Sequence, residues 1–399
     1  MTPQTKRRIA TYLALAMIPL SGFATDIYIP SLPEMGGALH VSSLQVQMTL
    51  SIFLISYGVS QLFIGAILDS FGRYRLGLIA LVIFAMASIV IATTHNIHLI
   101  YVMRALHGLT VATIVVAKRA YFVDVYKGDE LKSYLSIFTI IWSAGPIIAP
   151  FIGGYLQTGF GWSFNFYFLA GMALVLAILE MFFSAETLVH KAEFNLRKIV
   201  TTYFQMIATP SFTLGLIMLG FAYSMVMVYN LTGPFIIQHH LHFSPVTVGY
   251  CSLVLGFSWM LGGFISKATI NRPFFKKIVI NLFFQLLFVT AMVISLTSFE
   301  NLYSLVFFAF LIHTCGGYTF NNYFTSNLSQ FPENAGIASG LVGGVVFVIV
   351  SFLSYGVVSF IPAKDERNLS FSYLLLILAS FIVLYTIFHI NKKREKASR

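Results

Sequence analysis

The chain has 399 residues, of which 58% are apolar, 16% are aromatic and only 10% are charged. A soluble core of this size cannot bury so much apolar side chain, so the composition excludes a soluble globular protein and predicts an integral membrane protein. The formal net charge of +10 does not indicate nucleic-acid binding, because the basic residues lie at the ends of apolar segments and form no continuous patch.

A helix needs about 20 apolar residues to cross a bilayer, and twelve segments meet this length. We expect them at roughly residues 9–30, 43–67, 75–94, 98–119, 133–156, 162–184, 211–238, 245–268, 277–298, 302–326, 336–361 and 369–390. The predicted fold is all-α, with six-helix bundles at residues 1–184 and 211–399 and a linker at residues 185–210. Two halves of six spans predict a pseudo-symmetric transporter.

The basic residues indicate how these spans are oriented. They lie in both terminal tails, beside alternate loops and in the linker, whereas the opposite loops hold only Lys364 and Arg367. Basic flanks stay in the cytoplasm, so both termini and the linker are predicted to be cytoplasmic and to meet anionic membrane lipid. The linker is partly amphipathic, which predicts a helix lying on the membrane surface.

One acid and one base fall inside predicted spans. Asp26 lies near the outer end of the first span and Arg104 near the outer start of the fourth, so helical rise puts them at a similar depth. A buried arginine costs about 2.5–3.5 kcal/mol and needs a partner, so we predict that Arg104 faces Asp26 and tunes its proton exchange. The alternative is a permanent ion pair. His107 is interpreted either as part of a proton relay or as a hydrogen-bonding residue within the bundle.

An acid and a base four residues apart follow the second span. Asp69 and Arg73 share one helical face and can pair, and Gly65 and Gly72 are expected where the chain turns tightly. The alternative is an ordinary turn with a solvated ion pair.

The fifth predicted span carries a dense run of small residues and prolines. Its members are Gly145, Pro146, Ala149, Pro150, Gly153 and Gly154. Small residues at every fourth position predict close approach of a neighbouring helix, and the prolines remove two backbone donors and bend the span. The pattern is compatible with static packing and with a span that moves.

These motifs together resemble those of the major facilitator superfamily. The Asp69 loop is similar to its loop signature, the Arg104 segment to its fourth-span motif, and the fifth-span run to its antiporter motif. The stretch around Asp26, together with Asp124 after the fourth span, looks like the Bcr/CflA branch of drug-efflux transporters.

The resemblance implies the superfamily fold and a cytoplasmic gate. The gate residues it implies are Gly65, Asp69, Gly72, Arg73 and Asp124. Asp69 is expected to contact a helix N-terminus of the other half, near Ala335 and Gly336. The chain departs from the family at Ser70, where a basic residue is usual, and at His107, where glutamine is usual.

Neutral polar residues recur on the seventh and tenth spans. We expect a substrate cavity with aromatic faces and hydrogen-bonding groups, lined by Tyr28, Tyr229, Asn230, His313, Tyr318 and Asn321. Interhelical hydrogen bonding is the alternative for each of them. Glu180, near the cytoplasmic end of the sixth span, is expected to extend toward the membrane surface. Cys251 and Cys315 lie in apolar spans and predict no disulfide.

The predicted function is proton-coupled export of small organic molecules, such as drugs or a dedicated metabolite, by alternating access. We expect a monomer in a bacterial inner membrane, with no cofactor and no metal. An uncoupled facilitator or importer, with Asp26 and Arg104 as a structural lock, is the alternative. An enzyme is not expected, because the sequence has no nucleophile–base pair, metal motif or phosphate loop, and a scaffold would leave the duplicated layout unexplained.

Overall fold

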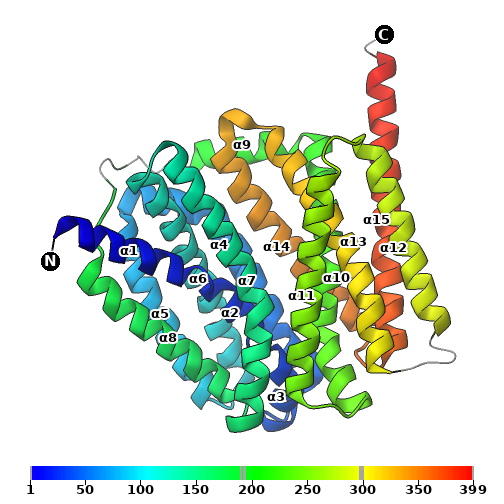
Figure 1. The fold of residues 1–399 in the computed structure, drawn as a ribbon, viewed down its shortest axis with the longest axis horizontal. Helices are drawn as coiled ribbons and strands as arrows, with labels where there is room; N and C mark the ends of the chain where they lie inside the picture. Colours follow the sequence, from blue (N-terminus) through cyan, green and yellow to red (C-terminus); the bar gives the residue numbers. More distant parts are fainter. Residues whose placement is uncertain (1, 189–190, 192–194, 296–300, 398–399) are drawn as a thin grey trace. The chain divides into compact units, whose positions relative to one another are not determined.

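The computed structural model describes residues 2–188, 191, 195–295 and 301–397, and the described chain is helical with no strand (Figure 1). Twelve helices in these ranges are long and apolar enough to cross a membrane. The prediction of an all-α membrane protein with twelve spans is confirmed.

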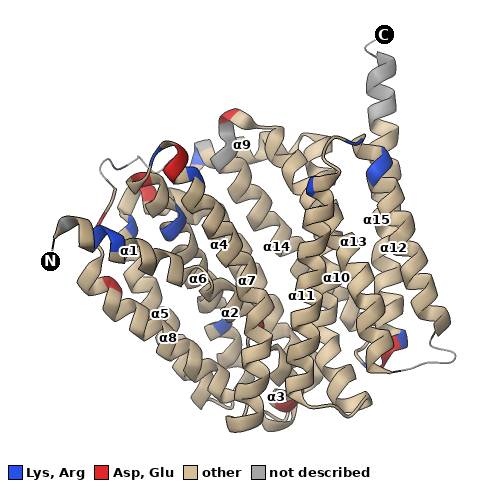
Figure 2. Cartoon of the chain, viewed as in Figure 1, with Lys and Arg blue, Asp and Glu red and all other residues tan. Residues whose placement is uncertain are grey.

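Contacts divide the chain into two compact units. The first takes in Met1–Leu196 and Ser244–Leu253, and the second takes in Arg197–Phe243 and Val254–Arg399. The bundle boundaries at residues 184 and 210 stay a prediction. Figure 2 shows that charged residues are sparse along the helices of each unit and gather toward helix ends.

The helices up to residue 183 belong to the first unit. In chain order they are α1 (Pro3–Met17), α2 (Leu20–Asp26), η1 (Ile29–Ser31), α3 (Leu32–Ala38), α4 (Ser43–Phe71), α5 (Arg73–Thr93), α6 (Ile97–Val125), α7 (Gly128–Phe160) and α8 (Ser163–Phe183). In this unit α6 packs against α4 and α5, α5 also packs against α8, and α2 packs against α7.

The remaining elements begin with a helix inside the predicted linker. They are α9 (Leu196–Ile207), α10 (Pro210–Phe235), η2 (Ile236–His240), α11 (Pro245–Ala268), α12 (Phe274–Ser295), α13 (Leu302–Ser329), η3 (Pro332–Asn334), α14 (Ala335–Phe360) and α15 (Glu366–Ala397). In the second unit α10 packs against α13, α14 and α15. The helix expected in the linker is α9, whose Phe204 side chain is 70% exposed.

The first span is a series of short helices. Pro19 precedes α2, Pro30 lies in η1 and Pro33 lies at the start of α3, and proline lacks the N–H that a continuous helix needs. Backbone outside regular helix is tolerated at membrane depth where protein surrounds it. The break leaves Asp26 as the last residue of α2.

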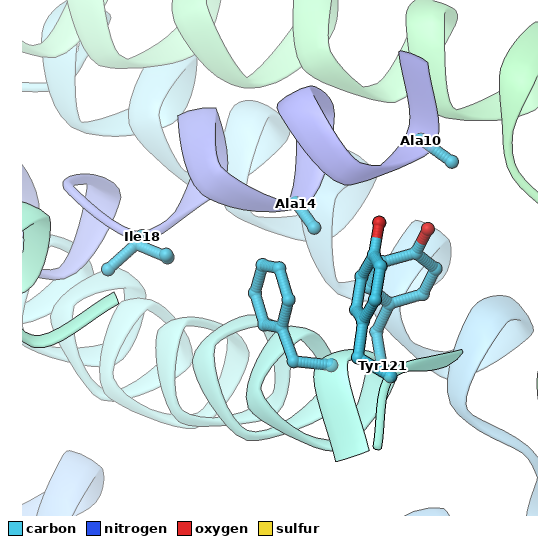
Figure 3. Packing of buried hydrophobic residues seen from close by; sticks show 6 residues of the cluster. Ala10, Ala14, Ile18 and Tyr121 are labelled. Atoms are coloured by element: carbon cyan, nitrogen blue, oxygen red, sulfur yellow. The ribbon is translucent and has the colours of Figure 1, made fainter. Parts of the chain in front are cut away.

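Helix α1 packs against the end of α6 through a regular stripe (Figure 3). Ala10, Ala14 and Ile18 are four residues apart, so they share one face of the helix or of its continuation. They contact a cluster of aromatic side chains that includes Tyr121. The small alanines let the rings approach the α1 backbone, which fixes the end of α6 on which the candidate gate residue Asp124 lies.

Candidate functional site

Arg104 of α6 is fully buried in the first unit. Its guanidinium donates to the carbonyl oxygens of Thr49 and Ala24, at 3.4 and 2.9 Å, and to the Tyr28 hydroxyl at 3.3 Å. The Tyr28 and Phe53 ring centroids lie 4.6 and 4.5 Å from its Cζ atom. Neutral dipoles and two aromatic faces therefore solvate the charge and tie α6 to α4 and to the broken first span.

Asp26 lies in the same buried region. Its residue is 2% exposed, and it follows by two positions the Ala24 carbonyl to which Arg104 donates. Arg104 also donates to the Tyr28 hydroxyl, two positions after Asp26. The structure thus brings Asp26 and Arg104 into one region, in agreement with the similar depth expected from their positions along the helices.

His107 has a geometry that assigns its tautomer. Arg104 Nη1 lies 3.2 Å from His107 Nδ1, and because an arginine can only donate, Nδ1 must accept. Nε2 therefore carries the proton and donates to Ser88 Oγ at 3.0 Å, while Ser88 donates to the Phe84 carbonyl oxygen at 2.8 Å. This neutral chain fits the hydrogen-bonding interpretation of His107 better than the relay interpretation.

The small residues of α7 lie against α2. A Cβ atom on Gly145 would lie 3.0 Å from the Pro19 carbonyl oxygen, and one on Gly153 would overlap the Ile27 carbonyl oxygen. The backbones of α7 and the first span thus touch directly beside Asp26, as the spacing predicted. Pro146 and Pro150 lie inside α7, and Gly154 is buried in the same helix.

The predicted gate residues meet at one end of the first unit. Arg73 Nη2 donates to Asp69 Oδ1 at 2.6 Å, and Arg73 Nη1 forms an ion pair with Asp124 and donates to the Ala120 carbonyl oxygen at 3.2 Å. We call Asp69, Arg73 and Asp124 the charge cluster. The arginine joins the end of α4 to the end of α6.

The two glycines expected in this turn differ. Gly72 has a φ of +105°, a conformation that favours glycine. Gly65 lies inside α4 with open space where a Cβ atom would be, so the expectation of a tight turn there was wrong. The expected contact of Asp69 near Ala335 and Gly336 stays a prediction.

An ion pair between α6 and α8 was missed by the sequence interpretation. Lys118 and Glu180 pair in the interior of the first unit, at 7% and 1% exposure, and Ser184 Oγ donates to Glu180 Oε2 at 2.9 Å. Glu180 therefore does not extend to the membrane surface, because a buried cation lies within its reach. A small cavity borders this pair and Arg73.

The expected substrate-cavity residues separate into different environments. Tyr28 belongs to the Arg104 region of the first unit. In the second unit, Tyr229 and His313 pack edge to face with ring centroids 5.8 Å apart, and His313 Nε2 lies 2.9 Å from the Tyr373 hydroxyl. This aromatic and polar contact links α10, α13 and α15.

The other three candidates lie elsewhere in the second unit. The Tyr318 hydroxyl lies 2.8 Å from Thr269 Oγ1, Asn321 donates to the Gly317 carbonyl oxygen of its own helix at 2.8 Å, and Asn230 is partly exposed on α10. These contacts are interhelical or local hydrogen bonds, and the cavity role stays a prediction. Cys251 and Cys315 are free thiols in buried positions, as expected.

These features define a helical membrane transporter. The sequence profile of the Major Facilitator Superfamily matches residues 14–355, and the chain belongs to this family, whose members are transporters and not enzymes.

Relatives and a solved structure agree with this assignment. A bicyclomycin resistance protein homolog of Haemophilus influenzae is 27% identical over 351 residues, covering 86% of each chain. The multidrug resistance protein MdtL of Shewanella oneidensis is 27% identical over 325 residues, covering 80% of each. The crystal structure of the nucleoside transporter NupG has a TM-score of 0.71 at 12% identity, covering 96% of this chain and 99% of that one. The expected resemblance to drug-resistance members of the superfamily is confirmed.

Proposed function

We propose that this protein is a proton-coupled exporter of small organic molecules that works by alternating access in a bacterial inner membrane, with both termini in the cytoplasm. The observation that carries the proposal is the buried acid beside a buried arginine in the first unit, where Arg104 donates to Ala24 and Tyr28 on either side of Asp26. An arginine keeps its proton in a protein, so Asp26 is the member of the pair that can change its charge.

The physical logic of coupling follows from this asymmetry. When Asp26 is ionised, its charge is balanced by Arg104, and when it takes up a proton, Arg104 keeps its bonds to neutral groups of Thr49, Ala24 and Tyr28. Neither state leaves an isolated buried charge without compensation. A cationic or polar compound that binds near Asp26 would favour the ionised form and displace the proton.

Export of drug-like compounds is supported by the names of two relatives, a bicyclomycin resistance protein homolog and a multidrug resistance protein. The neighbouring backbone contact between α7 and the first span supports the same role, because α7 meets the first span at Ile27, the residue after Asp26, and can transmit a change in its charge. The protein is expected to act as a monomer surrounded by lipid, without a cofactor.

Proton release from the purified protein tests this proposal. A panel of drugs and metabolites is added to wild-type protein and to Asp26→Asn in weakly buffered detergent solution. We expect a compound that binds both but releases protons only from the wild type. Glu34→Gln is the matched control, because Glu34 is an exposed acid of the same first span. Binding without proton release would instead support an uncoupled facilitator or importer in which Asp26 and Arg104 are a structural lock.

A further inference from the structure

The start of α5 is capped by a carboxylate from beyond α8. The first N–H groups of a helix have no partner within the helix, and Gly72 offers no side chain to cap them. Glu186 Oε1 accepts from the Arg73 N–H and Glu186 Oε2 from the Tyr74 N–H, each at 3.1 Å. The capping residue is 113 positions away from Arg73 in the chain.

Gly72 makes room for this carboxylate. A Cβ atom at this position would lie 2.7 Å from Glu186 Oε2, which is too close for a real contact. The glycine therefore serves the positive φ of the turn and also admits the cap. The positive end of the α5 dipole favours a negative group at this place.

Thr187, the residue after Glu186, contacts the Asp124 member of the charge cluster. Thr187 Oγ1 donates to Asp124 Oδ2 at 2.7 Å, and Asp124 also forms the ion pair with Arg73. Two consecutive linker residues therefore support the charge cluster. Glu186 fixes the backbone of Arg73, and Thr187 fixes Asp124, one of the two acids that bind the Arg73 side chain.

The cluster needs such support. The Asp69 side chain is 45% exposed, and an exposed ion pair stabilises little because water screens it and its side chains lose freedom. When the start of α5 and the Asp124 carboxylate are already fixed, less conformational entropy is lost as Arg73 forms its ion pairs with Asp69 and Asp124.

We propose that Glu186 and Thr187 are positioning residues of the charge cluster, which makes the beginning of the linker part of the gate. The contacts stand by themselves, and their consequence for transport rests on the proposed function. The linker therefore does more than connect the two bundles. Displacing residues 186–187 frees the Arg73 backbone and weakens the Asp69–Arg73–Asp124 contacts.

Amide hydrogen exchange tests the contacts directly. The full-length protein in detergent is compared with Glu186→Gln, which keeps the side-chain shape but loses the charge and one acceptor. We expect the Arg73 and Tyr74 amides to exchange about tenfold faster, as for loss of a charge-assisted hydrogen bond. Asp129→Asn is the matched control, since Asp129 is an acid in an exposed pair with Lys132, and it should leave these amides unchanged. Unchanged exchange in Glu186→Gln would overturn the proposal.

Transport kinetics test the positioning role. Thr187→Val removes the donor to Asp124, whereas Thr187→Ser keeps it, so we expect kcat to fall severalfold in the valine variant, with KM unchanged, and to recover in the serine variant. Equal kcat in both variants would overturn the role in transport. If the wild type moves no compound, the proposed function fails, while the exchange measurement still decides whether Glu186 caps α5.

Discussion

Several neutral groups hold the Arg104 guanidinium, so Arg104 and Asp26 should differ in their effect on stability. Replacing Arg104 by Ala removes four hydrogen bonds, to Thr49, Ala24, Tyr28 and His107, and leaves the buried Asp26 without the neighbouring positive charge. We expect a loss of about 3–5 kcal/mol, typical of breaking a buried charge interaction. Asp26→Asn should cost less, because the bonds of Arg104 to neutral groups remain. Thermal unfolding in detergent measures the stability of both variants. Equal losses would argue against the view that neutral groups hold Arg104 when Asp26 is replaced.

His107 allows the relay and hydrogen-bonding interpretations to be separated. Glutamine can accept from Arg104 and donate to Ser88 as the imidazole does, so His107→Gln should keep stability and leave the pH profile of transport unchanged. His107→Leu leaves the Arg104 Nη1 donor without this acceptor and Ser88 Oγ without this donor, and it should cost about 1–3 kcal/mol. A pH profile that shifts in His107→Gln, with normal stability, would restore the relay interpretation.

The buried Lys118–Glu180 ion pair joins α6 to α8, and its contribution to stability can be measured. Glu180→Gln leaves Lys118 buried without its countercharge and should destabilise the first unit by about 3–5 kcal/mol. The double variant Lys118→Met with Glu180→Leu should be nearly neutral in stability, because apolar side chains of similar volume avoid the cost of burying charge. A double-mutant cycle that adds the single variants Lys118→Met and Glu180→Leu gives the coupling free energy from unfolding measurements. Additive losses would mean that the two side chains do not act as a pair.

The cap on α5 should depend on pH. Burial raises the pKa of Glu186, but the N–H groups of Leu188, Arg73, Tyr74 and Thr187 lower it more, and the net pKa lies below the usual glutamate value. A lowered pKa in the folded state means that the cap contributes fully above the ordinary glutamate pKa and is lost as the pH falls through the lower folded value. The ratio of Arg73 and Tyr74 amide exchange in Glu186→Gln to that in wild type should therefore approach one in acid. A ratio that stays constant down to that range would show that the charge of Glu186 does not hold α5.

At the scale of the molecule, hydropathy and spacing predicted the elements well, because a membrane helix must be long and apolar whatever it packs against. The Asp69–Arg73 pair was also predictable, since four residues separate its members on the helical turn. The rotation of each helix and its neighbours were not predictable. The basic residues at span ends, Lys118 among them, were interpreted together as markers of topology, and Glu180 as a residue near the membrane surface. Position along a helix gives depth but does not identify the facing helix. Glu186 lay in a polar linker, and nothing local links it to α5.

The proposed coupling predicts how far the whole protein can drive export. One proton entering down a potential of 100 mV releases about 2.3 kcal/mol. For a neutral substrate exchanged one for one with the proton, this sustains a substrate gradient of roughly fiftyfold at 1.4 kcal/mol per factor of ten. In proteoliposomes with an imposed potential, wild type and Glu34→Gln should accumulate an identified neutral compound toward this limit. Asp26→Asn should only equilibrate it, because a side chain that cannot ionise has no proton to exchange. Accumulation by Asp26→Asn against the gradient would remove Asp26 from the coupling step and place the proton on another group.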